Sequence, residues 1–210
     1  MTLCRSVAML VSLVLVPLTV AAAPPPEPTV EYSADSTMET EGGMTMKSRV
    51  YHTPTKQRME MGGADGSVTI IRKDKKVVWQ VMGDMYMEMP LDQSNAPDMG
   101  GFDIQEQTEV GEETINGLKT TKTKIIATKP DGSKFGGFFW TTKEGVTVKM
   151  DLLSKEGDKK MRMASELTNV KIEKQNPALF EVPAGATKND MGAMMGQGGM
   201  PNMEEMMKNA

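Results

Sequence analysis

The sequence predicts an all-β protein, built from one meander of antiparallel strands with at most one or two short helices. Turn dipeptides such as Gly42-Gly43, Gly83-Asp84 and Asn116-Gly117 recur about every ten residues, and apolar and polar side chains alternate between them. No window of about twelve residues in the body of the chain keeps the helical period of an amphipathic helix. Both observations favour strands over helices.

Both ends of the 210-residue chain are expected to lie outside this fold. Residues 1–22 have the parts of a secretory signal peptide: Arg5, then an apolar run, then small residues before Ala23. The run is short for a membrane span and contains Pro17, so we expect cleavage, a periplasmic location and no transmembrane segment in the mature chain. Residues 23–29 form a Pro-rich spacer, residues 30–185 the β domain, and residues 186–210 a Met- and Gly-rich tail expected to be disordered.

The first half of the domain is expected to hold six strands. Pro54 ends the second strand, and Gly83-Asp84 joins the last two. Because side chains alternate along a strand, Val77, Trp79 and Val81 share one face of the fifth strand, and Met85, Met87 and Met89 share one face of the sixth. The six strands are Val30–Thr40, Met44–Thr53, Lys56–Met61, Ser67–Lys73 and the two arms of Lys75–Pro90.

The second half begins with an irregular stretch over Pro90–Gly101 that holds one helical turn at Leu91–Asn95. Pro130-Asp131-Gly132 predicts a hairpin turn, Gly136-Gly137 predicts a bulge or a sharp bend, and Asn176–Phe180 predicts one more helical turn. The five strands expected here are Ile104–Val110, Leu118–Lys129, Lys134–Thr142, Val146–Leu153 and Lys160–Glu173.

Charge and cysteine content exclude several classes of function. The net charge is −4, the pI is near 5.2 and there is no basic cluster, so nucleic acid is not an expected partner, nor is electrostatic capture by anionic lipids. The single cysteine, Cys4, lies in the signal segment. The mature chain is therefore expected to have no disulfide, no thiolate nucleophile and no cysteine-bound metal.

The sequence offers little support for catalysis. His52 is the only histidine, lies next to a strand end and has no serine or cysteine elbow to accompany it. The acidic group Glu106, Glu109, Glu112 and Glu113 is typical of a solvated face, and no phosphate-binding loop is present. We expect a non-enzymatic protein without a cofactor.

Three stretches resemble LolA/LolB-like periplasmic proteins, and most of all the branches of that superfamily that have no known function. The motifs are Asp74 with Trp79, Tyr86 with Glu88, Trp140 shortly before a Gly-Val pair, and the closing Phe180-Glu181-Val182-Pro183. The resemblance extends from Glu31 to Gly185. It implies an antiparallel sheet curled into a half-barrel, whose concave face holds an acyl chain or a lipoprotein's lipid in characterised members. It implies no catalytic set.

Methionine is the unusual feature of the composition, with 22 residues against 5 Phe and 2 Trp. Four interpretations are open. The methionines replace leucine as core filler, line an adaptable groove for an apolar ligand, bind a soft metal ion such as Cu(I) or Ag(I) through their thioethers, or act as a sacrificial sink for oxidants.

The sequence therefore predicts a periplasmic binding protein that holds an apolar ligand, such as a lipid or lipoprotein acyl chain, or an envelope protein partner. The residues expected to line the concave sheet are Trp79, Val81, Met85, Met87, Met89, Phe139 and Met150. The alternative is a Cu(I)- or Ag(I)-binding envelope protein that acts through the tail residues Met191, Met194, Met195, Met200, Met203, Met206 and Met207.

Overall fold

In the computed structural model, the described residues are 27–62, 66–94, 103–128, 132–156 and 159–189. They form one twelve-stranded sheet and two short 3-10 helices, η1 and η3. The predicted all-β fold with one or two short helices is confirmed. The expected signal peptide (residues 1–22), most of the spacer and the chain from residue 190 lie outside the described residues.

The strands follow the alternating segments of the sequence closely. The most extended difference is β7, which continues to Ile115 because the turn at Asn116-Gly117, with both residues at positive φ, follows directly. The first half holds β1 (Tyr32–Thr40), β2 (Thr45–Thr53), β3 (Lys56–Met61), β4 (Val68–Arg72), β5 (Val77–Met82), β6 (Met85–Pro90) and η1 (Leu91–Gln93). The second half holds β7 (Asp103–Ile115), β8 (Leu118–Thr128), β9 (Lys134–Thr141), β10 (Thr147–Glu156), β11 (Lys159–Ile172), η3 (Pro177–Phe180) and β12 (Thr187–Lys188).

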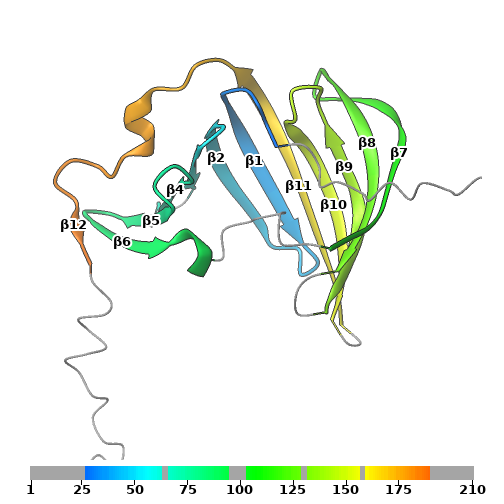
Figure 1. Cartoon of the computed structure of the whole chain (residues 1–210), viewed down its shortest axis with the longest axis horizontal. Helices are drawn as coiled ribbons and strands as arrows, with labels where there is room; N and C mark the ends of the chain where they lie inside the picture. Colours follow the sequence, from blue (N-terminus) through cyan, green and yellow to red (C-terminus); the bar gives the residue numbers. More distant parts are fainter. Residues whose placement is uncertain (1–26, 63–65, 95–102, 129–131, 157–158, 190–210) are drawn as a thin grey trace, which may run out of the picture.

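The sheet order is β12-β6-β5-β4-β3-β2-β1-β11-β10-β9-β8-β7. Strand β1 pairs with β2 on one side and with β11 on the other, so the two halves of the chain join at the centre of the sheet. Figure 1 shows that the sheet curls across its width, and β12 and β7 form its two unjoined ends. The expected half-barrel architecture is confirmed.

The short strand β12 was not expected from the sequence. Thr187 and Lys188 pair in parallel with Met85 and Tyr86 of β6, and the Lys188 Nζ donates to Glu88 Oε1 at 2.8 Å. Two residues are too few for an alternation to be visible in the sequence. The chain after the β domain is therefore held against the outer edge of β6.

The glycine pair in β9 does not form the bulge that the sequence predicts. Gly136 and Gly137 pair continuously with β8 and β10, and the register shift on β10 lies instead between Thr147 and Lys149. The backbone at Gly137 lies so close to β10 that an added Cβ would be 2.0 Å from the Asp151 carbonyl oxygen. Close approach of two strands is the reason for glycine here.

The strand register divides the side chains into two faces, because residues that pair across a ladder point to the same side. One row runs Met87–Gln80–Thr69–Met59–Val50–Ala34, and we call this side the methionine face. The neighbouring row runs Glu88–Trp79–Ile70–Arg58–Tyr51–Ser33, and we call this side the charged face.

The buried core falls into three clusters. On the methionine face of β8–β10, Ile125, Phe139 and Leu152 form one of them. A second, around Tyr32, Ala34, Val146 and Val148, lies near the centre of the sheet. On the charged face of β4–β6, helix η3 inserts Phe180 over the third cluster, which consists of Ile70, Trp79, Val81 and Phe180. Each face is therefore covered or buried only over part of its width, among the described residues.

Candidate functional site: the methionine face

All the methionines in the described strands lie on one face of the sheet. The register joins them across both halves: Met38 pairs with Met46, Met82 pairs with Met85, and Met150 pairs with Phe139. Each strand contributes them at alternate positions, as the period of a β-strand requires. The set is Met38, Met46, Met59, Met61, Met82, Met85, Met87, Met89, Met150, Met161 and Met163.

These methionines are not core filler in the ordinary sense. None of them is among the buried residues, and Met82, Met85 and Met161 are 43, 46 and 58% exposed. Met150 and Met163 pack against the first core cluster, and the others belong to none of the three clusters. Within the described part of the chain, the methionine face from β2 to β6 thus carries partly exposed methionines around the polar pair Thr69 and Gln80.

The predicted binding residues are divided between the two faces. Met85, Met87, Met89, Phe139 and Met150 lie on the methionine face. Phe139 is buried in the first core cluster, and Met150 packs against that cluster. Trp79 and Val81 point to the charged face, because the Gly83-Asp84 turn pairs Val81 with Tyr86 and Trp79 with Glu88.

Trp79 and Val81 lie buried in the cluster beneath Phe180. The Trp79 indole nitrogen donates to Glu88 Oε2 at 2.8 Å. The Lys75 ammonium lies 5.1 Å from the ring centroid, and the Arg72 guanidinium lies 5.6 Å from it. The Lys188 ammonium first, and the Trp79 indole second, hold the pKa of Glu88 below its ordinary value. These contacts give both residues a structural role.

Five methionines and one glutamine are among the residues of the methionine face that the predicted site lacks on the first half of the sheet. The signal that finds them is the same period of two: each strand pair of methionines in the sequence lies on the same side once the strands are in register. They are Met38, Met46, Met59, Met61 and Met82, together with Gln80 between Met59 and Met87.

The predicted metal ligands, from Met191 to Met207, lie outside the described residues, so the Cu(I) alternative stays a prediction. Over the described ranges, no group of three or more His, Cys, Asp or Glu side chains could hold a metal ion. Within the same ranges, no helix has the length and apolar character needed to cross a membrane.

The side chains considered for catalysis are engaged in other contacts. The His52 ring stacks on Tyr32 at a centroid distance of 5.0 Å, and burial lowers the pKa of His52. Glu106 and Glu113 each pair with a lysine, Lys124 at 3.0 Å and Lys122 at 2.9 Å. These two carboxylates are thus paired with lysines, as is typical of a solvated face.

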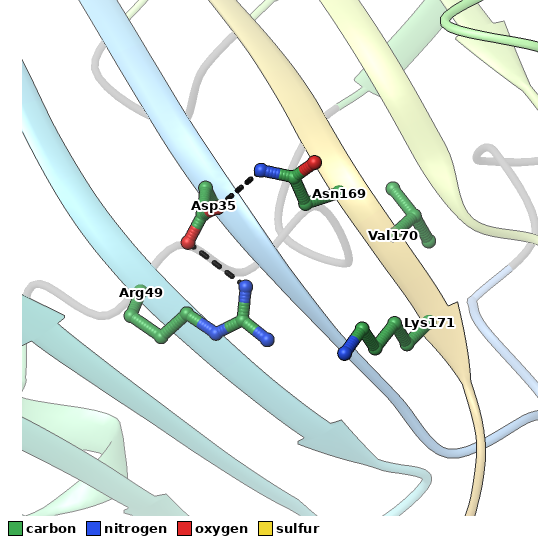
Figure 2. Close-up of a pocket in the computed structure, with 5 residues that line it drawn as sticks. All are labelled: Asp35, Arg49, Asn169, Val170 and Lys171. Atoms are coloured by element: carbon green, nitrogen blue, oxygen red, sulfur yellow. Dashed lines mark hydrogen bonds and ion pairs between the residues drawn. The ribbon is translucent and has the colours of Figure 1, made fainter.

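A second candidate site is a pocket of about 450 Å³ around Asp35 and Arg49, where β1, β2 and β11 meet. Figure 2 shows Asp35 accepting hydrogen bonds from Asn169 Nδ2 and Arg49 Nη1, both at 2.8 Å. The Asn169 amide first, and Arg49 second, hold the pKa of Asp35 below its ordinary value. Arg49 is already bound to Asp35 and to Ser33, so this pocket is a satisfied polar cluster.

The methionine face is the stronger candidate because the described part of the chain leaves its methionine side chains partly exposed. Thioethers on unbranched side chains adapt to ligands of varied shape and offer no nucleophile or strong base. The rows of this face cross β2–β6, five strands spaced about 4.8 Å apart, which is a span of about 20 Å. The arrangement can bind an elongated apolar group.

Comparison with known proteins shows the fold. Neither a family model nor a curated protein matches the chain. A crystal structure of MucB is similar with a TM-score of 0.52 at 11% identity, over 77% of this chain and 60% of that one. The chain therefore spans less than two thirds of the length of MucB.

Two further solved structures have lower TM-scores. The MucA/MucB complex of Pseudomonas aeruginosa matches with a TM-score of 0.49 at 11% identity, over 75% of this chain and 57% of that chain. A Vibrio parahaemolyticus domain described as an outer membrane lipoprotein-sorting protein matches with 0.36 at 8% identity, over 72% and 89%. The described part of the chain shares the fold of MucB. At these identities the likeness concerns the fold alone.

Proposed function

We propose that the chain is a non-enzymatic, periplasmic binding protein that holds an acyl chain, free or part of a lipoprotein, on the methionine face. One observation carries the proposal: all eleven strand methionines lie on one side of the sheet, and none of them is buried. An acyl chain laid along the rows of β2–β6 would remove this apolar surface from water, which is favourable by about 25 cal/mol per Å² of buried apolar area.

The location follows from the signal-like segment at residues 1–22, with Arg5 followed by an apolar run. The absence of cysteine from the rest of the sequence removes covalent thiol chemistry, so binding is desolvation of the acyl chain without a bond-forming step. The Cu(I) alternative depends on tail methionines that lie outside the described residues, so it stays a prediction from the sequence.

Native mass spectrometry with palmitate tests the proposal on the full mature chain. We expect an adduct of palmitate mass, and we expect the double variant Met59→Gln/Met87→Gln to lose most of it. Glutamine has a similar length but is polar, and the two residues share one row of the methionine face.

The matched control is Lys47→Gln, which places glutamine at an exposed position of the charged face, opposite Thr37. This variant should bind palmitate as the unmodified chain does, and circular dichroism should show that both variants keep the β fold. Absence of the adduct from the unmodified chain, or equal loss in the two variants, would overturn the proposal.

A further inference from the structure

The first half of the sheet uses methionine where packing alone would accept leucine. Residues 27–90 contain nine methionines and no leucine or phenylalanine. Leucine is ordinarily among the commonest residues in globular proteins. On the same face of the second half, the apolar positions are Ile125, Phe139 and Leu152, and these are buried. On this face of the first half, Val50, Ile71 and Val78 are buried, so the apolar side chains there that stay partly open to solvent are the methionines.

Two of these methionines form an exposed pair at the tip of a hairpin. Met82 and Met85 are Cα partners on either side of the Gly83-Asp84 turn, and they are 43 and 46% exposed. Both point to the methionine face, where Met87 follows Met85 along β6. Susceptibility of a thioether to oxidants rises with its exposure.

We propose that Met82 and Met85 are sites of reversible oxidation to methionine sulfoxide by hypochlorous acid, and that this modification lowers the affinity of the methionine face for an acyl chain. The inference rests on the proposed function, because the two side chains border the surface to which the acyl chain would bind. It adds a regulatory step that the proposed function does not require.

The chemistry balances with one oxidant and one reductant. In the net reaction a sulfur–oxygen bond forms as the oxygen–chlorine bond breaks; sulfur loses two electrons, chlorine leaves as chloride, and the proton of hypochlorous acid goes to water. A dithiol-dependent methionine sulfoxide reductase reverses the change. The dithiol supplies two electrons and two protons, the oxygen leaves as water, and the dithiol becomes a disulfide.

The sulfoxide changes the surface from apolar to polar at its edge. Its oxygen is a hydrogen-bond acceptor that water satisfies while the face is open. An acyl chain lying across Met82 and Met85 would remove that water and offer no donor in exchange, which is unfavourable. Bound acyl chain should, by the same geometry, protect the two thioethers from the oxidant.

The test treats the full mature chain with a few equivalents of hypochlorous acid and maps sulfoxides by peptide mass spectrometry. Met82 and Met85 should be modified before Met59, Met87 and Met89, and palmitate should slow their modification. Palmitate affinity should fall about tenfold or more, which corresponds to leaving one polar group unsatisfied on binding. Methionine sulfoxide reductase with a dithiol should restore it.

Leucine variants assign the effect to the hairpin pair. Met82→Leu/Met85→Leu keeps the apolar volume and cannot be oxidised, so its palmitate affinity should change less than about twofold on treatment. The control variant Met44→Leu/Met161→Leu removes two methionines that are 63 and 58% exposed. After treatment with hypochlorous acid, this variant should lose palmitate affinity as the unmodified chain does. Met82→Gln/Met85→Gln should bind weakly before any treatment.

The two proposals fail in different ways. If untreated protein binds palmitate and oxidation leaves that affinity unchanged, or weakens the Met82→Leu/Met85→Leu variant equally, the inference is overturned and the proposed function stands. A sulfoxide map that leaves Met82 and Met85 unmodified has the same meaning. If untreated protein binds no palmitate, the proposed function is overturned and the regulatory step with it.

Discussion

Arg72 illustrates, at the scale of the residue, how a buried charge can join two elements. Its side chain is 4% exposed, and its Nε and Nη2 donate to both oxygens of Asp74 at 2.8 and 2.7 Å. Its Nη1 donates to the carbonyl oxygen of Phe180 at 3.1 Å and to the Glu181 carboxylate. The guanidinium therefore satisfies the end of η3 and holds it on β4, as a planar, five-donor group can.

Replacing Arg72 by alanine should lower the free energy of unfolding by about 2–3 kcal/mol, because it removes the charged donor from the buried hydrogen bond to the Phe180 carbonyl oxygen and from the partly exposed carboxylates of Asp74 and Glu181. The matched control is Arg162→Ala. Arg162 makes the same two-bond contact with Asp151, at 2.9 and 2.8 Å, but its side chain is 55% exposed. Its loss should be clearly smaller, because water screens an exposed ion pair. Urea unfolding of the two variants measures the difference, and equal losses would contradict this role for Arg72.

At the scale of the element, the position of β9 beside β10 depends on two glycines in β9. Gly136 and Gly137 lie between the aromatic residues of the strand, and β10 lies beside them in the sheet, with Leu152 as the pairing partner of Gly137. A Cβ there would be 2.0 Å from the Asp151 carbonyl oxygen and 2.9 Å from the Leu152 Cα. Both of these are backbone atoms, so no rotamer change can relieve the overlap.

The adjacent glycine provides the comparison for a test. Gly137→Ala should lower the free energy of unfolding by about 2–3 kcal/mol or prevent folding, because β9 and β10 must separate to admit the methyl group. Gly136→Ala should cost less, since its Cβ would meet the Ile125 carbonyl oxygen at 3.2 Å, an overlap of a few tenths of an ångström. Thermal unfolding followed by circular dichroism compares the two, and a larger loss in Gly136→Ala would contradict this account.

At the scale of the whole molecule, the two faces of the sheet carry different chemistry. The charged face carries cross-strand ion pairs such as Arg49–Asp35, Lys149–Glu166 and Arg162–Asp151. The methionine face carries the thioethers and most of one core cluster. Under the proposed function, the acyl chain would bind to the methionine face and the charged face would stay in water.

The ion pairs of the molecule predict loss of stability in acid. The hydrogen bond from Arg72 holds the pKa of Asp74 at about 2, against an ordinary 3.8, and hydrogen bonds from Arg162 and Lys122 lower the pKa values of Asp151 and Glu113. Between the folded and unfolded pKa values the unfolded chain binds more protons, so stability rises with pH in that range. The contribution is complete above the unfolded values and is lost as pH falls through the folded ones.

Urea unfolding at pH 7, 5, 4 and 3 should therefore show a free energy of unfolding that is nearly constant at the upper pH values and falls below about pH 5. In Asp74→Asn the fall should be smaller, because the group with the pKa of about 2 no longer titrates. If the free energy of unfolding of Asp74→Asn falls below pH 5 as steeply as that of the unmodified chain, Asp74 contributes nothing to the loss of stability in acid. Sodium chloride should weaken the contribution of the Arg72–Asp74 pair to this fall only slightly, because Arg72 is buried and salt screens a buried charge less.

Much of the fold was predictable because strand period and turn chemistry are local properties. The strands and turns of the first half, including Gly83-Asp84, lie where alternation and turn dipeptides place them. The shared face of Met85, Met87 and Met89 follows from the same period. The two-residue turn also implies that Trp79 lies on the opposite face from these methionines. The turn makes Met82 and Met85 partners and so pairs Trp79 with Glu88.

The sequence by itself therefore determined the strands and which methionines share a face within one strand. The tertiary structure alone decided that β1 pairs with β11, which brings Met38 and Met150 to the same side. It also decided that Phe180 covers Trp79 and leaves the methionine face half-open. The physical reason is that alternation is set by neighbouring residues, whereas strand pairing and burial depend on segments more than a hundred residues apart, whose register no local pattern records.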